Sequence, residues 1–224
     1  MRRHTYDFGV IGNCAYTAHI HKNTNISWMC WPRFDSSFIF GGLLDEEKGG
    51  EFSVKPLETE FQTKQYYIEN TNILCTEVES ETGKYKVTDF APRFYQTDRY
   101  YRPLMLIRKV ERMDGNPRII VKCKPKGDYG NVTPQSSMGS NHIRFLGLEA
   151  HCRLTTNISL NYVLGEESFV LNETKYMVMT YGSPLEASLE ETVDLFLSKT
   201  KNYWRNWIKT AAIVNFSQRE AIRS

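Results

Sequence analysis

Short runs of alternating apolar and polar residues, each closed by turn residues, fill the chain up to about Pro184. Residues 16–22 alternate along their whole length, and a period of two is typical of a strand with one buried face. Further strands are predicted at 73–79, 85–90, 104–111, 119–124, 143–145, 158–164, 168–171 and 175–181. Because no helical pattern separates these runs, a parallel α/β sheet is disfavoured. The spacing predicts a mainly β fold, either an antiparallel sandwich or a barrel, over residues 1–184.

Two turns have recognisable sequences. Residues 73–79 and 85–90 flank Ser-Glu-Thr-Gly-Lys, a hairpin signal in which Gly83 can adopt a positive φ. Residues 104–111 and 119–124 flank Met-Asp-Gly-Asn-Pro-Arg, which predicts a second hairpin turn of the Asp-Gly type.

The hydrophobic period changes after Pro184. Ser188 and Glu191 form a capping box, which marks the start of a helix. Apolar residues then recur at three- and four-residue steps along a helix of ~20 residues. They are Leu189, Val193, Phe196, Leu197, Trp204, Trp207, Ile208 and Ala211. We assign residues 185–214 to this C-terminal helix.

A second capping box, Ser217 with Glu220, lies close to the last residue, Ser224. So short a helix gains little stability by itself. A frayed terminal helix is one interpretation. The pattern favours the other, in which residues 215–224 begin a further helical region.

Composition excludes several classes of function. The 224 residues have a net charge of +2 with no long basic run, which disfavours nucleic-acid binding. No run approaches the ~18–20 apolar residues of a membrane span, and the N-terminus lacks the apolar core of a signal peptide. Five cysteines are scattered singly, without disulfide or zinc spacing. We expect a soluble, cytoplasmic protein with reduced thiols.

No complete catalytic set is visible. His19 and His21 share one face of a predicted strand, yet no further metal ligand is evident. The carboxylates of Asp35, Asp89 and Asp98 cannot be paired across a substrate from one sequence. No phosphate-binding glycine loop is present. We expect no catalytic residue, no metal and no cofactor.

Residues 31–36, Trp-Pro-Arg-Phe-Asp-Ser, form an unusual loop after an apolar strand. In one interpretation Arg33 pairs with Asp35 to stiffen the turn and Ser36 caps it. In the other the loop meets a partner surface, with Trp31 and Phe34 supplying contact area and the two charges supplying specificity.

These motifs resemble the opening of bacterial and archaeal glycoside hydrolase family 15 proteins, the glucoamylase, glucodextranase and trehalase-like enzymes. The matching stretches, in order, are Ile-Gly-Asn at 11–13, Trp-Pro-Arg-Phe-Asp-Ser at 31–36, Leu-Leu-Asp at 43–45 and Gly-Gly at 49–50. The Thr-Asn-Ile-Leu segment at 71–74, Val-Thr-Asp-Phe-Ala-Pro at 87–92, Arg-Pro at 102–103, Tyr-Gly at 129–130 and Tyr-Trp-Arg-Asn-Trp-Ile at 203–208 continue the match. The family's Asp-Gly turn is replaced by Asn23 and Asn25, residues that can also adopt positive φ.

The resemblance implies an antiparallel super-β-sandwich, joined by linker helices to a catalytic barrel of paired helices. Residues 215–224 would then begin that barrel. The family's general acid and general base are glutamates of the barrel, so none can be assigned here. The chain is thereby expected to be a non-catalytic domain whose partners are its own C-terminal catalytic barrel and, in the parent enzyme, an α-glucoside.

Three roles follow from the resemblance. The loop of Trp31, Arg33, Phe34, Asp35 and Ser36 would help shape the sugar pocket. Alternatively, the domain would be an independent carbohydrate-binding module that uses exposed aromatic rings. In the third interpretation the domain only orients the barrel. The interface would then be formed by Trp204 and Trp207.

Overall fold

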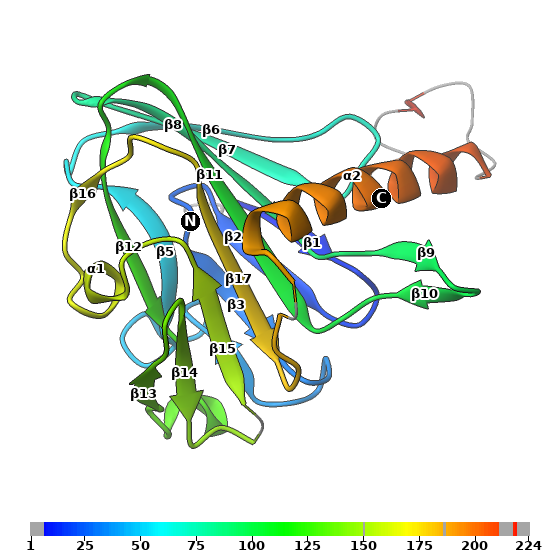
Figure 1. The fold of residues 1–224 in the computed structure, drawn as a ribbon, viewed down its shortest axis with the longest axis horizontal. Coiled ribbons are helices and arrows are strands. Elements are labelled where there is room, and N and C mark those ends of the chain that lie inside the picture. Colours follow the sequence, from blue (N-terminus) through cyan, green and yellow to red (C-terminus); the bar gives the residue numbers. More distant parts are fainter. Residues whose placement is uncertain (1–6, 150, 186, 211–216, 219–224) are drawn as a thin grey trace, which may run out of the picture.

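A computed structural model describes residues 7–149, 151–185, 187–210 and 217–218 of the chain. Its largest element is an eight-stranded antiparallel sheet in the order β13-β14-β15-β17-β11-β8-β7-β6. The strands of this sheet are β6 (Gln62–Tyr67), β7 (Leu74–Ser80), β8 (Gly83–Phe90), β11 (Met105–Gly115), β13 (Gln135–Met138), β14 (His142–Leu146), β15 (Cys152–Thr156) and β17 (Lys175–Tyr181). Figure 1 shows this sheet as one layer of a sandwich.

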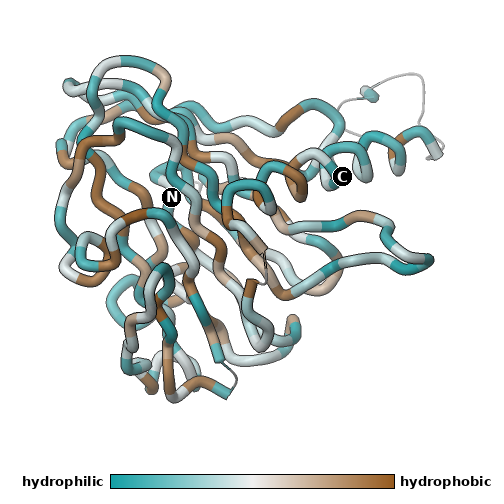
Figure 2. The backbone as a smooth tube through the Cα atoms, viewed as in Figure 1, coloured by the Kyte–Doolittle hydropathy of each residue, from teal (hydrophilic) through white to brown (hydrophobic). Residues whose placement is uncertain are grey.

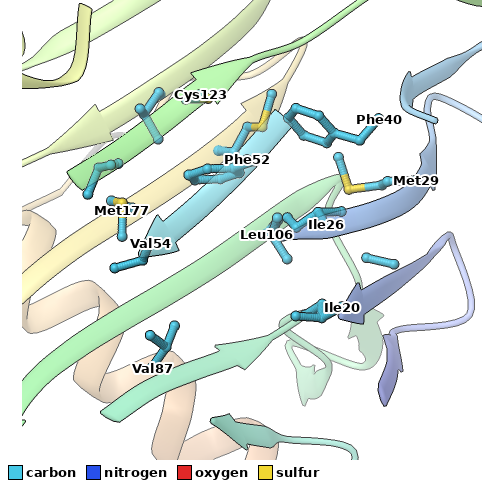
Figure 3. Close-up of a cluster of buried hydrophobic side chains, with 14 of the residues drawn as sticks. Ile20, Ile26, Met29, Phe40, Phe52, Val54, Val87, Leu106, Cys123 and Met177 are labelled. Carbon is cyan, nitrogen blue, oxygen red and sulfur yellow. The ribbon is translucent and has the colours of Figure 1, made fainter. Parts of the chain in front are cut away.

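Two smaller antiparallel sheets form the opposite layer. One contains β1 (Phe8–Gly12), β2 (Thr17–His21), β3 (Ile26–Cys30) and β4 (Phe38–Phe40), in that order. The other has the order β16 (Phe169–Val170), β12 (Arg118–Lys124) and β5 (Glu51–Pro56). All three sheets contribute to a single buried cluster, which includes Ile20, Phe52 and Leu106 (Figure 3). Figure 2 shows hydrophobic positions concentrated along these strands. The prediction of a mainly β, antiparallel sandwich is confirmed.

The two smaller sheets are joined by the turn between β2 and β3. The Thr24 hydroxyl accepts a hydrogen bond from the Val54 amide at 2.9 Å and donates to the Val54 carbonyl at 2.7 Å. The Asn25 side-chain oxygen accepts from the Phe52 amide at 3.1 Å. The β2–β3 hairpin is present, and its positive φ, 71°, belongs to Thr24 rather than to Asn23 or Asn25. These bonds attach the β2–β3 turn to the edge of β5 and so join the two sheets.

A fully buried ion pair connects the two layers. Arg108 and Asp89 lie directly opposite each other on β11 and β8, and Arg108 Nε donates to Asp89 Oδ1 at 2.8 Å. The guanidinium also donates to the carbonyl oxygens of Phe52 and Thr24 in the opposite layer. This buried charge is therefore paired and hydrogen-bonded within the sandwich through Nε, Nη1 and Nη2.

The predicted hairpin of residues 73–79 and 85–90 is confirmed as β7 and β8, with Gly83 at φ 153°. The predicted hairpin across residues 112–117 is wrong. Strand β11 pairs with β8 and β17, whereas β12 pairs with β5 and β16. The turn instead moves the chain from one layer to the other, because Asn116 and Arg118 donate to Thr82 of the β7–β8 loop.

Residues 158–164 also differ from the prediction of a strand. They contain a short helix, α1 (Leu160–Leu164), closed by a hydrogen bond from the Gly165 amide to the Asn161 carbonyl at 2.8 Å. Ile158 and Val163 are buried, while Tyr162 is exposed. A single helical turn buries these two residues without the sheet partner that a strand would need.

The C-terminal helix is confirmed as α2 (Leu189–Lys209). Leu189, Val193, Phe196 and Leu197 pack on the outer face of the eight-stranded sheet, against a second buried cluster that includes Tyr176. Ser188 is the N-cap residue, but its side chain makes no capping hydrogen bond, so the predicted capping box is not formed. The second box involves Glu220, outside the described residues, and the boundaries 1–184, 185–214 and 215–224 stay predictions.

The distal half of α2 extends beyond the sheet, beside a two-stranded hairpin of β9 (Phe94–Gln96) and β10 (Arg99–Tyr101) (Figure 1). A one-turn 3-10 helix, η1 (Asp128–Gly130), follows β12. Within the described part of the chain, no helix has the length and apolarity needed to cross a membrane.

Candidate functional site

Several segments of the resemblance converge at one end of the sandwich. Asn13, in the β1–β2 turn, is buried, and its side-chain amide donates to the carbonyls of Pro92 at 3.1 Å and Pro103 at 2.8 Å. The ring of Trp31 packs on Tyr16 of the same turn, with centroids 5.2 Å apart. We call this end, formed by residues 13–16, 31–37 and 91–104, the motif end.

Arg93 connects the motif end to helix α2. Its Nε donates to the Tyr203 hydroxyl at 2.7 Å, and its Nη1 donates to the Asn13 carbonyl at 2.6 Å. The guanidinium lies 5.2 Å from the Tyr100 ring centroid and 5.1 Å from that of Tyr203, which are cation–π distances. The Arg93 amide donates to the Thr200 hydroxyl at 3.2 Å. One side chain thus fixes the β1–β2 turn, the hairpin and the helix relative to one another.

Sequence reasoning missed Arg93. The residue follows the Val-Thr-Asp-Phe-Ala-Pro segment, and its partner Tyr203 begins the Tyr-Trp-Arg-Asn-Trp-Ile segment. The two residues lie 110 positions apart in the chain. That they meet could only be learned from the packing of α2 on the sheet.

The loop after β3 contains the predicted ion pair. Arg33 donates to Asp35 through Nε at 2.8 Å and through Nη2 at 3.2 Å. The hydrogen bond from Arg33 lowers the pKa of the Asp35 carboxyl. The Ser36 hydroxyl accepts from the Arg33 amide at 3.3 Å, and the Phe34 ring is exposed. The expectation of Trp31 as exposed contact area is wrong, because Trp31 is buried between Tyr16 and Tyr181.

The two tryptophans of α2 lie beyond the sheet. Trp207 is exposed and Trp204 is half-buried, and their ring centroids are 6.0 Å apart. Nothing in the described residues covers the exposed face of Trp207, so its role in interdomain packing stays a prediction.

The candidate carboxylates do not form an acid–base pair. Asp89 is buried against Arg108, Asp35 is bound to Arg33, and Asp98 is exposed at the tip of the β9–β10 hairpin. The three positions belong to different environments. The arrangement therefore supplies a frame and exposed aromatic rings, and two of the three candidate carboxyls are already bound to arginines.

The two histidines do not form a metal site in the described residues, which contain no suitable group of three histidine, cysteine, aspartate or glutamate side chains. His19 stacks on Phe8 with centroids 4.9 Å apart, and burial lowers the pKa of its imidazole. His21 Nδ1 accepts a hydrogen bond from the Asn23 amide. The five cysteines are free thiols, and burial raises the pKa of Cys123 and Cys152.

Comparison with known proteins gives a consistent group of relatives. A trehalase of Thermoplasma volcanium is 28% identical over 96% of this chain and 36% of its own length. Trehalase 1 of Sulfolobus acidocaldarius is 29% identical over 90% of this chain and 34% of its own length. A trehalase of Mycolicibacterium smegmatis is 26% identical over 90% of this chain and 34% of its own length. The chain spans about a third of the length of these relatives.

The model of one protein family, described as "Trehalase-like, N-terminal", matches residues 4–163. This match covers β1 to β15 and most of α1, which includes the motif end and the buried Arg108–Asp89 pair. The chain therefore belongs to the trehalase-like N-terminal domain family.

Proposed function

We propose that this chain is the non-catalytic N-terminal domain of a trehalase-like glycoside hydrolase, and that it supports a catalytic domain that follows it. The observation on which this depends is the coverage of the relatives. The chain aligns over nearly its whole length with the trehalases, but with only 34–36% of theirs. A domain that orients its neighbour needs a rigid frame rather than reactive groups, and the packed sandwich is such a frame.

We assign the chemistry of the parent enzyme to the part that corresponds to the two thirds of the relatives' length not covered by this chain. Inverting hydrolysis of an α-glucoside such as trehalose needs two carboxyls about 6.5–9.5 Å apart, one as acid and one as base. Of the candidate carboxyls, Asp35 and Asp89 are already paired with arginines, so neither is free to serve as that acid or base. The five free cysteines support a cytoplasmic location, because disulfides are rare in that compartment.

The finer proposal concerns the loop after β3. Its exposed Phe34 ring and its Arg33–Asp35 pair lie at the motif end, next to the turn that Arg93 connects to helix α2. A rigid, exposed loop of this kind supports a role in shaping the sugar pocket of the adjoining catalytic domain.

The first prediction concerns activity. A parent polypeptide that includes the residues following Ser224 is expected to release glucose from trehalose, and residues 1–224 alone are expected to release none. A coupled glucose assay measures both. If the parent hydrolyses no α-glucoside, the proposal fails. Calorimetric titration of the chain with trehalose and maltooligosaccharides provides a second check, because millimolar or tighter binding would favour a carbohydrate-binding module.

The second prediction concerns the loop. In the parent, Arg33→Ala frees Asp35 and loosens the loop, so kcat/KM for trehalose is expected to fall by roughly tenfold, as for a lost positioning contact. Lys22→Ala is the matched control, because Lys22 forms an exposed ion pair with Asp7 at the opposite end of β2. Equal kcat/KM for both variants would contradict a role of the loop in the sugar pocket.

A further inference from the structure

The β9–β10 hairpin leaves the sandwich between β8 and β11, and neither of its strands pairs with a third strand of the described sheets (Figure 1). Its inner face is held by helix α2. Phe94 stacks on Tyr101 with centroids 4.9 Å apart, and both rings contact Phe196. An isolated two-stranded hairpin is at best marginally stable. These inner contacts therefore keep the hairpin in place.

The outer face of the hairpin presents a tyrosine pair to solvent. Tyr95 is 59% exposed and Tyr100 is 56% exposed, and their ring centroids are 5.5 Å apart. Large exposed aromatic side chains that gather at one place are typical of interaction surfaces.

This pair continues onto helix α2 through a chain of ring contacts. The Tyr100 and Tyr203 centroids are 6.0 Å apart, those of Tyr203 and Trp204 are 5.1 Å apart, and those of Trp204 and Trp207 are 6.0 Å apart. We call these five side chains, Tyr95, Tyr100, Tyr203, Trp204 and Trp207, the aromatic ridge. The ridge runs from the hairpin to the last turns of the helix.

We propose that the aromatic ridge, including the β9–β10 hairpin, is the docking surface for the domain that continues from helix α2. This inference rests on the proposed function, which places a catalytic domain there. The trehalases are about three times as long as the aligned segment. Helix α2 ends at Lys209, two residues after Trp207, so the continuing polypeptide starts beside the ridge.

The ring geometry distinguishes a protein partner from a sugar. Successive rings of the ridge meet at interplanar angles of 71°, 83°, 75° and 81°. Edge-to-face rings give no shared flat surface along which successive glucose units could stack. Such rings do offer clefts between neighbouring edges, which suit side chains of a protein interface.

Arg93 gives this surface its rigidity. Its guanidinium is within cation–π distance of both Tyr100, from the hairpin, and Tyr203, from the helix. The ridge is therefore ordered before the partner binds, which lowers the entropic cost of docking. Arg93 acts as a positioning residue, because it holds the two halves of the surface in register.

The test uses thiol labelling in the parent polypeptide. Tyr95→Cys and Tyr100→Cys introduce reporters on the ridge, and Tyr162→Cys, on α1, is the matched control. Tyr162 is an exposed tyrosine, at 38%, and Figure 1 shows α1 on the opposite side of the molecule from the hairpin. Peptide mass spectrometry follows maleimide labelling at each position, which separates these sites from the exposed Cys14.

Positions 95 and 100 are expected to react at least about tenfold more slowly than position 162, because a thiol in an interface reacts only when the interface opens. In this domain by itself, Tyr95 and Tyr100 are more exposed than Tyr162, which predicts faster labelling at positions 95 and 100. Equal or faster labelling on the ridge overturns the proposal. Protection that needs saturating trehalose also overturns it, in favour of a sugar platform. Because labelling is independent of turnover, protection in a parent that hydrolyses no α-glucoside would refute the proposed function alone.

Discussion

Two arginine–aspartate pairs in this chain have the same geometry and opposite surroundings. Arg33 and Asp35 are joined by bonds of 2.8 and 3.2 Å, and Arg108 and Asp89 by bonds of 2.8 and 3.3 Å. The first pair is mostly exposed, at 76% and 71%, whereas the second is fully buried. Water screens the first pair, while the second must be satisfied by protein groups alone.

We predict that Asp89→Asn lowers the free energy of unfolding by about 3–5 kcal/mol, because it leaves the buried Arg108 charge without its counter-ion. Urea unfolding followed by tryptophan fluorescence measures the change. Asp35→Asn is the matched control and is expected to leave the unfolding midpoint unchanged. Similar losses for the two variants would show that burial does not set the strength of these pairs.

At this scale the sequence identified residue types but not their surroundings. The Arg33–Asp35 pair was foreseen as one interpretation because its partners are two residues apart. Asp89 was noted only as a candidate carboxylate, since Arg108 lies across a strand pairing that the sequence does not reveal. Trp31 supplied contact area in one interpretation of the loop, yet Tyr16 and Tyr181 enclose it.

Helix α2 packs on the eight-stranded sheet and on the β9–β10 hairpin, and Phe196 in its first half contacts both. The first half covers the outer face of the eight-stranded sheet, where Val193 is fully buried. The second half contacts the β9–β10 hairpin and ends beside the exposed Trp207. Tertiary packing of an apolar face stabilises such a helix more than intrinsic propensity does.

We predict that Val193→Ala lowers the free energy of unfolding by about 2 kcal/mol, since it removes two fully buried methyl groups from the helix–sheet contact. Leu195→Ala, half exposed on the same helix, is the control and is expected to change stability by less than about 0.5 kcal/mol. Thermal unfolding monitored by circular dichroism gives both values. An equal effect at the two positions would mean that α2 does not pack on the sheet as described.

Period-two runs and one helical stripe are strong local signals, so helix α2 and strands such as β2, β7, β8 and β17 were predictable. No strand was predicted at β1, β4, β5, β6, β9, β10, β13 or β15. The pairing of the strands was harder to predict than their positions in the sequence. The turn at 112–117 has the sequence of a hairpin, but Thr82 accepts from both Asn116 and Arg118 and directs the chain to the other layer. The short helix α1 was mistaken for a strand because five residues are too few to show a helical period.

The whole molecule is held by ion pairs as well as by its core. Glu166, after α1, pairs with Lys124 and Lys122 of β12, and the hydrogen bond from Lys124 is the main cause of its lowered pKa. Other surface carboxyls also have lowered pKa values. They are Asp7, Asp35, Asp45, Glu51, Glu58, Glu77 and Glu173.

A carboxyl with a lowered pKa in the folded state stabilises the fold above its unfolded pKa, and this contribution is lost as pH falls through the folded pKa. We predict that the free energy of unfolding falls as pH drops below about 4.5, near the unfolded values for aspartate and glutamate. Urea titrations between pH 7 and pH 3 measure this. Glu166→Gln is expected to reduce the pH dependence, and a stability that rises on acidification would contradict the prediction.

At the scale of the molecule, the resemblance predicted the sandwich and the helix that follows it. It did not predict that one layer consists of two sheets joined by side chains of a turn. That junction depends on the Thr24 hydroxyl meeting the Val54 backbone, two residues that lie 30 positions apart. Local patterns do not encode such a meeting, and neither did they indicate that Arg93 reaches Tyr203.

Because α2 lies on the outer face of the large sheet, strand β17 is buried at all seven of its positions, whereas β14 has exposed side chains at Arg144 and Leu146. The two strands are therefore expected to tolerate substitutions at different numbers of positions. We expect substitutions to be tolerated at the exposed positions of β14 and to be destabilising at each buried position of β17. Homologous domains are expected to differ mainly at every second position of β14 and to differ little along β17.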